Sequence, residues 1–229
     1  MTAPEPIVIA EGAEDAPEQL LKQFSDPLDC LRELLQNAID AGSNEAHVAC
    51  TFEEDAAPGL PGMGAAVLRV KDYGEGMDRH IIDTRLTRLF SSDKLTDRTK
   101  IGRFGIGFIS VFAMFPDVVC VDTSRHGETW RVLFRPDRSF VRVYLPEPME
   151  GTCVRLWKTM SRAEFELFET RVRRALRHHA QYLDITLTYQ GERFNVPLHE
   201  GALVAVENRL NDETIVVSYP RPGEPITAT

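Results

Sequence analysis

The pattern of apolar and polar positions predicts a domain that mixes helices with hairpin-connected strands. A helix is expected from Pro27 to about Ala41, because Asp26 is a suitable N-cap, proline favours the first helical position and Gly42 is a typical stop. Apolar residues recur at intervals of three and four along this segment, which predicts one buried face. They are Leu28, Leu31, Leu35, Ala38 and Ile39.

Short runs of apolar and β-branched residues predict strands in much of the remaining chain. The breaks between the later runs, such as His126-Gly127, suit antiparallel hairpins. Residues 79–90 are expected to be helical, and residues 107–115 are apolar on all sides, which is typical of a helix buried in a core. The predicted strands are 46–52, 65–71, 118–124, 129–134, 140–145, 152–158, 185–189 and 193–196.

The two ends of the chain carry weaker signals than its centre. Residues 1–19 form an acidic tail with an apolar run at 7–9 that could add an edge strand. A second amphipathic helix is expected to begin at the capping box Ser161–Glu164. We therefore expect one domain over 20–196, followed at 197–229 by a linker or the start of another domain.

The polar side chains Glu33, Asn37 and Asp40 share one face of the first predicted helix, opposite its leucines. An amide oxygen there could ligate Mg²⁺, a hard cation that takes few protein ligands and fills its octahedron with water and phosphate oxygens. A carboxylate one turn away could orient and deprotonate a water for attack on a terminal phosphate. Alone, this pattern is more often an ordinary polar helix face.

Two glycine-rich strings change that balance. In Asp72-Tyr-Gly-Glu-Gly-Met77 an aspartate ends an apolar strand, and the glycines allow the backbone to approach a ligand closely. A buried carboxylate at this position could accept from the exocyclic amine of adenine, which the carbonyl of guanine could not reproduce. The hydroxyl of Thr152, at the start of another strand, could reach the same base directly or through water.

The second string, Ile101-Gly-Arg-Phe-Gly-Ile-Gly-Phe108, leads directly into the buried apolar helix. Successive backbone N–H groups and the positive end of a helix dipole favour a polyphosphate at such a place. The preceding polar segment, residues 91–100, reads as a loop that could close over a nucleotide. It and the glycine string offer cations to the phosphates: Lys94, Arg98, Lys100 and Arg103.

Composition excludes several other classes of protein. The net charge is −9, and residues 1–60 hold 13 acidic but only two basic side chains, which argues against binding nucleic acid through this domain. No uncharged run is long enough to span a membrane, and the first residues lack the features of a secretory signal. The four cysteines form no Cys-x-x-Cys pair, so we expect free thiols and a cytoplasmic location.

These motifs resemble those of the ATPase superfamily shared by DNA gyrase, the ninety-kilodalton heat-shock chaperone, sensor histidine kinases and MutL mismatch-repair proteins. Residues 31–41, 72–77 and 102–107 are similar to its three motifs in order and approximate spacing. The third motif, which lies in the second glycine string, is most similar to the chaperone version, as are Leu31-Arg-Glu-Leu34 and Ser91-Ser-Asp-Lys94. The resemblance implies an α+β fold, a two-layer α/β sandwich (the Bergerat ATP-binding fold) whose mixed, mostly antiparallel sheet is covered on one face by helices.

The resemblance also implies roles for individual residues. Glu33 would be the hydrolytic base, Asn37 the Mg²⁺ ligand and a nucleotide contact, and Asp72 the adenine contact. The other residues expected to contact ATP or ADP are Asp40, Ala41, Gly74, Gly76, Met77, Lys94, Gly102, Arg103, Phe104, Gly105, Ile106, Gly107, Phe108 and Thr152.

Two departures from the chaperone pattern limit what the resemblance implies. The segment from Met77 to Gly102 is shorter, and in the chaperone a following domain supplies a cation to the terminal phosphate. We therefore expect Mg²⁺-dependent ATP binding with slow or no hydrolysis by this chain alone, a nucleotide-dependent homodimer and client or partner proteins. The alternatives are the ATPase module of a DNA-repair or topology protein, a histidine-kinase-type domain, and a nucleotide-binding regulatory domain without turnover.

Overall fold

The computed structural model describes residues 8–10, 26–57, 60–87, 107–180, 183, 185–195, 204–210 and 213–219; for the first and the last two ranges it describes the backbone. The loop expected to close over the nucleotide (residues 91–100) and most of the second glycine string (residues 101–108) lie outside these ranges. Six of the expected site residues therefore have no described position: Lys94, Gly102, Arg103, Phe104, Gly105 and Ile106.

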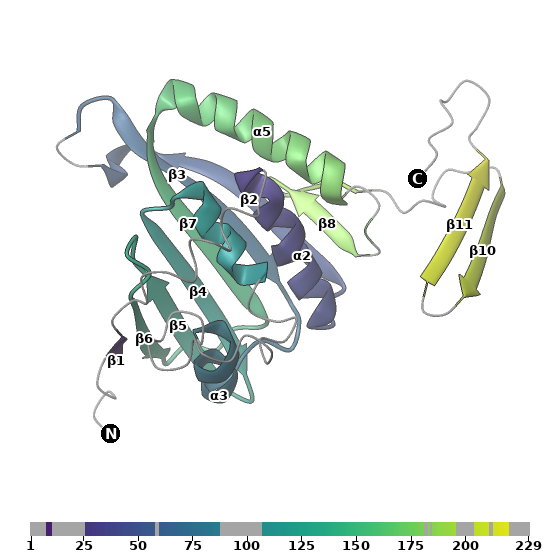
Figure 1. Ribbon diagram of the computed structural model, residues 1–229, viewed down its shortest axis with the longest axis horizontal. Helices are drawn as coiled ribbons and strands as arrows, with labels where there is room; N and C mark the ends of the chain where they lie inside the picture. The colour runs from purple at the N-terminus through teal and green to yellow at the C-terminus, as the bar shows by residue number, and fades with distance from the viewer. Residues whose placement is uncertain are drawn as a thin grey trace.

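The architecture is α+β, with a nine-stranded mixed sheet in the order β1-β6-β5-β4-β7-β3-β2-β8-β9. Neighbouring strands are antiparallel except β2 and β8, which run parallel. Figure 1 shows the helices α2 and α5 together on one face of the sheet, as the fold prediction requires. The strands are β1 Val8–Ala10, β2 Glu45–Glu53, β3 Met63–Asp72, β4 Val118–Arg125, β5 Glu128–Phe134, β6 Phe140–Leu145, β7 Thr152–Ser161, β8 Thr186–Tyr189 and β9 Glu192–Arg193.

The helical segments are short apart from two. The expected helix at 79–90 is a single α-turn followed by a π-helical turn, and its last residues lie outside the described ranges. The second long helix begins where predicted, because the side chains of Ser161 and Glu164 cap it with reciprocal hydrogen bonds. The segments are η1 Pro27–Asp29, α2 Cys30–Asp40, η2 Glu54–Ala56, α3 Arg79–Ile81, η3 Ile82–Leu86, η7 Ser110–Met114 and α5 Arg162–Ala180.

The first predicted helix is present as η1 and α2. The Oδ1 atom of Asp26 accepts a hydrogen bond from the Leu28 N–H at 2.9 Å, and Gly42 follows the helix with a φ of 76°. Its buried face packs on the sheet and includes Leu34, which the predicted stripe had left out. Because this face is anchored in the core, the polar face is held in a fixed orientation.

The apolar segment at residues 107–115, which begins at the end of the second glycine string, is buried as far as Met114. A helical turn at 107–109 continues into η7, and the rings of Phe108 and Phe112 contact Phe134 at centroid distances of 5.6 and 5.8 Å. The expectation that Phe115 is also buried is wrong, because this residue adopts a left-handed conformation, with a φ of 51°, and is 77% exposed. The left-handed turn ends the segment and directs its side chain outward.

Two short elements lie at the ends of the chain. β1 pairs with β6 and forms one edge of the sheet, close to the residues 7–9 where an edge strand was expected. The region after residue 197 contains a hairpin that the sequence pattern did not predict, formed by β10 Val204–Leu210 and β11 Glu213–Tyr219, which pair with each other. The division of the chain into a tail, a domain and a linker remains a prediction.

Candidate functional site

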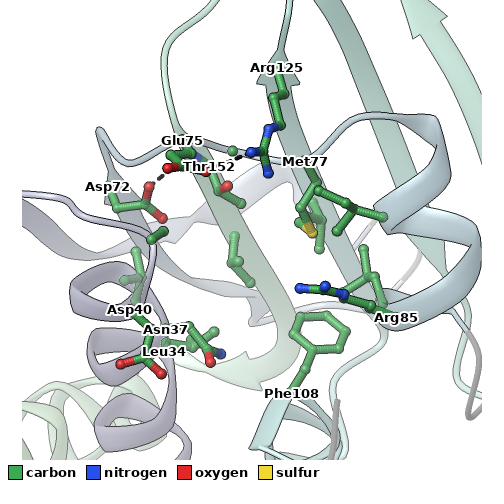
Figure 2. Close-up of a pocket in the computed structure, with 17 residues that line it drawn as sticks. Leu34, Asn37, Asp40, Asp72, Glu75, Met77, Arg85, Phe108, Arg125 and Thr152 are labelled. Atoms are coloured by element: carbon green, nitrogen blue, oxygen red, sulfur yellow. Dashed lines mark hydrogen bonds and ion pairs between the residues drawn. The ribbon is translucent and has the colours of Figure 1, made fainter. Parts of the chain in front are cut away.

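A cavity of about 210 Å³ lies between α2, η3 and the ends of β3, β4 and β7. Figure 2 shows side chains from these separate elements converging on it. Most of the expected site residues in the described ranges line this cavity: Asn37, Asp40, Ala41, Asp72, Gly76, Met77, Phe108 and Thr152. Glu33, Gly74 and Gly107 lie close by but do not line it.

The face of α2 presents two polar side chains to the cavity, and they differ in their hydrogen bonding. Within the described residues, the amide of Asn37 makes no hydrogen bond, so its oxygen is available to a ligand. Asp40, one turn further along, accepts a hydrogen bond from Gln36 at 2.8 Å and is exposed. Asn37 is therefore better placed than Asp40 to contribute an oxygen ligand.

Glu33 lies one turn before Asn37, where α2 meets the start of the apolar segment. Its Oε1 atom accepts a hydrogen bond from the Arg32 guanidinium at 2.7 Å, and 26% of its side chain is exposed. Its Oε2 atom lies so close to Gly107 that a Cβ added there would be only 2.6 Å away. A residue larger than glycine would push this carboxylate aside, so the last glycine of the second glycine string and the acid of the first helix are packed together.

Asp72 lies at the end of β3, on the opposite wall from η3. Its Oδ1 atom accepts hydrogen bonds from the N–H groups of Gly74 at 2.9 Å and Thr152 at 3.1 Å. Its other carboxylate oxygen has no hydrogen-bond partner among the described residues. Burial raises the pKa of Asp72 above its ordinary value, although the two N–H donors act in the opposite direction.

The loop that follows Asp72 is fixed by contacts with three other elements. The Glu75 N–H donates to the Ala41 carbonyl at 2.9 Å, and the Met77 N–H donates to the Thr123 hydroxyl at 2.8 Å. Gly76 has a φ of 65° and packs directly against the Ser124 carbonyl, where a Cβ could not fit. The glycine therefore allows the loop to approach β4 closely and form one end of the cavity.

Three charged residues that line the cavity were missed by the sequence reasoning. Glu75 and Arg125 form an ion pair at 2.7 Å, which links the Asp72 loop to the end of β4. Arg85, on η3, points into the cavity from the side opposite Asn37 (Figure 2). Glu75 could have been found between the two glycines of its motif, whereas the two arginines are 40 residues apart and carry no local signal.

The cavity also has an apolar lining that looks like ordinary core in the sequence. These side chains form a surface against which a flat, weakly polar ring can be buried, next to the single free carboxylate oxygen of Asp72. They come from α2, β3, α3, η3, β4 and β7: Leu34, Val70, Ile81, Leu86, Val121 and Val154.

The side chains around the cavity could hold a divalent cation only together with a bound molecule that supplies further oxygen ligands. Among the described residues there is no group of three or more His, Cys, Asp or Glu side chains that could hold a metal. The amide oxygen of Asn37 could supply one protein ligand to Mg²⁺, which commonly takes its other ligands from water and phosphate. All four cysteines are free thiols, and none of the helices in the described ranges is long and apolar enough to cross a membrane.

Comparison with known proteins places the chain in a family. The model of the histidine kinase-, DNA gyrase B- and HSP90-like ATPases matches residues 27–141, which include α2, the Asp72 loop and η7. Among curated proteins, the chain is 29% identical over 192 residues to the chaperone protein HtpG of Actinobacillus pleuropneumoniae serotype 5b. That match covers 77% of this chain and 29% of the relative.

Two further relatives carry the same name. HtpG of Nitratidesulfovibrio vulgaris is 31% identical over 193 residues, covering 72% of this chain and 30% of the relative. HtpG of Rhodospirillum rubrum is 29% identical over 221 residues, covering 86% and 33%. This chain thus spans about a third of the length of these relatives. It is a member of the family of histidine kinase-, DNA gyrase B- and HSP90-like ATPases.

Proposed function

We propose that this chain binds ATP with Mg²⁺ in the cavity and hydrolyses it slowly, as the nucleotide-binding domain of a chaperone-like protein. The observation that carries the proposal is the arrangement at the two ends of the cavity. One end presents the free oxygen of Asp72 beside apolar side chains. At the other end α2 presents Asn37 to the cavity, and Glu33, one turn away, packs against Gly107 just outside the lining. These two ends match the two chemically different ends of ATP.

The base is assigned to the Asp72 end of the cavity. The exocyclic amine of adenine would donate to the free carboxylate oxygen, while the ring is buried against the apolar lining that includes Val121 and Val154. The hydroxyl of Thr152, which is hydrogen-bonded to Thr123 at 3.0 Å, is close enough to the Asp72 carboxylate to contact the same base. Guanine would present a carbonyl oxygen to the carboxylate and would be rejected.

The phosphates are assigned to the side of the cavity formed by Asn37, Arg85 and Phe108. The Arg85 guanidinium would neutralise phosphate charge, and Asn37 would supply a ligand to Mg²⁺. When bound, Mg²⁺ would neutralise the charge on the phosphate oxygens. Glu33, one turn from Asn37, would hold and deprotonate the attacking water, and the N–H groups at the start of the 107–109 turn would be available to the phosphates.

The relatives named as HtpG chaperones favour a chaperone-like protein over the DNA-repair or topology alternative, as does the acidic charge balance. We extend the proposal to a nucleotide-dependent homodimer, to client or partner proteins and to a cytoplasmic setting. Slow turnover is proposed because Glu33, the expected base, accepts a hydrogen bond from Arg32 and does not line the cavity.

A nucleotide-binding domain without turnover is the second candidate. It is favoured by the position of Glu33, which does not line the cavity and accepts a hydrogen bond from Arg32. A thermal shift with Mg²⁺-ATP tests binding, because a ligand that binds only the folded state raises the melting temperature. Phosphate release by the native chain and by Glu33→Ala then separates the candidates: hydrolysis that depends on Glu33 supports an ATPase, and its absence from both proteins supports the second candidate.

A further inference from the structure

A second concave site lies at the β9 edge of the sheet, between the C-terminal half of α5 and the β8–β9 hairpin. Its volume is about 250 Å³, and its lining is dominated by guanidinium groups. Arg173 and Arg177 approach from α5, and Arg193 approaches from β9. The other lining residues are Tyr189, Gln190, Glu192 and Phe194, so the wall holds three cations and one carboxylate.

Most of the other described arginines form ion pairs or hydrogen bonds within the fold, but the two arginines on α5 that line the cleft do not. Arg173 and Arg177 are exposed and make neither an ion pair nor a hydrogen bond within the part of the chain that the structure describes. Glu169, one turn before Arg173, forms no ion pair with it there. By contrast Arg171, on the same helix, lies 3.3 Å from the Asp26 carboxylate. Arg173 and Arg177 therefore bring two cations to the cleft that form no ion pair with a described carboxylate.

Contacts within the fold hold Arg173 and the β8–β9 hairpin in place. The Arg173 guanidinium lies over the Tyr189 ring, with its Cζ atom 5.0 Å from the ring centroid. Gln190 fixes the hairpin to β2, because its side chain donates to the Cys50 carbonyl at 2.5 Å. The Arg193 Nε donates to the Asn195 carbonyl at 3.2 Å. A cleft with two such fixed walls requires little reordering when a ligand enters.

We propose that this cleft is a binding site for a multiply charged phosphoryl anion, separate from the nucleotide cavity. Guanidinium groups line this cleft from a helix and from a hairpin, so they can approach the oxygens of one phosphoryl group from different sides. Each can donate paired, charge-assisted hydrogen bonds. The proposal does not depend on the assignment of ATP, because none of these residues lines the nucleotide cavity.

Isothermal titration of the full chain with inorganic pyrophosphate tests the site, with sodium chloride holding the ionic strength constant. Arg177→Gln is the key variant, because Arg177 does not pack on Tyr189, and the Arg173→Gln, Arg177→Gln double variant follows. Arg174→Gln is the matched control, since Arg174 lies on the same helix and outside the cleft. A loss of about tenfold or more in pyrophosphate affinity is expected for Arg177→Gln, with no change for Arg174→Gln.

The same titrations distinguish the proposal from its alternatives. If the double variant binds pyrophosphate more weakly but binds Mg²⁺-ATP with unchanged affinity, the anion binds in this cleft. Pyrophosphate that does not bind, or binds equally well to the native chain and the double variant, overturns the proposal. Citrate that binds as tightly as pyrophosphate, and is lost in the same variants, overturns the assignment to a phosphoryl group.

Discussion

The substitution Asp72→Asn separates recognition of the base from stability of the fold. The Oδ1 atom of an asparagine can still accept the N–H groups of Gly74 and Thr152, so the contacts that hold the Asp72 loop survive. The oxygen that faces the cavity becomes an amide NH₂, which would meet the amine of adenine as one donor facing another. The fold is therefore expected to persist while ATP binding fails.

The size of the effect follows from the contact that is lost. A hydrogen bond to a charged group contributes about 1.5–3 kcal/mol, and leaving a buried donor unsatisfied costs about 1–3 kcal/mol. Even the lower ends of these ranges together predict that the Kd for Mg²⁺-ATP rises about 70-fold or more. GTP should be affected less, because the new amide can donate to the guanine carbonyl, so the preference for ATP over GTP should shrink.

The stability of the apo protein gives a second, independent readout. Because burial raises the pKa of Asp72 above 3.8, the folded state binds this proton more tightly than the unfolded state does. Ionised Asp72 therefore lowers the free energy of unfolding as pH rises from 3.8 through the raised pKa, and that cost persists above it. Removing the charge in Asp72→Asn should leave the melting temperature at pH 7 unchanged or higher.

Titration calorimetry with Mg²⁺-ATP and Mg²⁺-GTP, beside a thermal melt of the apo protein, measures both effects. Asp55→Asn is the matched control, since it makes the same change on the exposed turn η2, away from the cavity. ATP affinity within about threefold of the native value in Asp72→Asn would refute the base assignment. A large fall in apo melting temperature would instead show that the carboxylate serves the fold.

Three further results are expected. Glu33→Ala should abolish phosphate release while leaving the Mg²⁺-ATP thermal shift in place, and undiminished release would show that another group is the base. Arg85→Gln should weaken ATP binding by about tenfold and leave adenosine binding unchanged, since a charge-assisted phosphate contact is lost; equal losses in calorimetry would place Arg85 against the nucleoside. Gly76→Ala should lower the free energy of unfolding by about 2 kcal/mol or more in urea denaturation, because its φ is 65° and it packs on the Ser124 carbonyl; a change below about 0.5 kcal/mol would contradict this reading.

ATP affinity should also depend on pH in a defined direction. The amine of adenine donates a stronger hydrogen bond to an ionised carboxylate than to a protonated carboxyl group, and burial places the pKa of Asp72 above its ordinary value of 3.8. Binding should therefore weaken as pH falls through that raised pKa, at a higher pH than an exposed carboxylate would give. Affinity measured from pH 7 downward in native protein tests this, and a profile that is flat until the protein unfolds would contradict it.

The sequence predicted those elements whose signals are local. The cap at Asp26, the stop at Gly42 and the capping box at Ser161 each act over a few residues, and the structure contains all three. The core-facing strands were equally clear, because they are runs of apolar and β-branched residues bounded by turn residues. Burial alternates along β2 and is nearly continuous along β3 and β4. The glycine motifs were readable because only glycine permits the close approach seen at Gly76.

Features created by tertiary contacts could not be predicted from the sequence. The Glu75–Arg125 ion pair joins residues 50 apart in the chain. Arg85 points into the cavity from η3, and no sequence period marks that position. Phe115 was assigned to the core by composition, whereas a left-handed backbone conformation exposes it. The hairpin of β10 and β11 had no strong alternation and was missed.

The position of the nucleotide can be tested by a structure of the chain with Mg²⁺ and a non-hydrolysable ATP analogue. The adenine amine is expected to lie within hydrogen-bond distance of the free Asp72 oxygen, with the phosphates running past Arg85 towards Asn37 and Gly107. A nucleotide bound elsewhere, or bound with its phosphates at Asp72, would contradict this expectation.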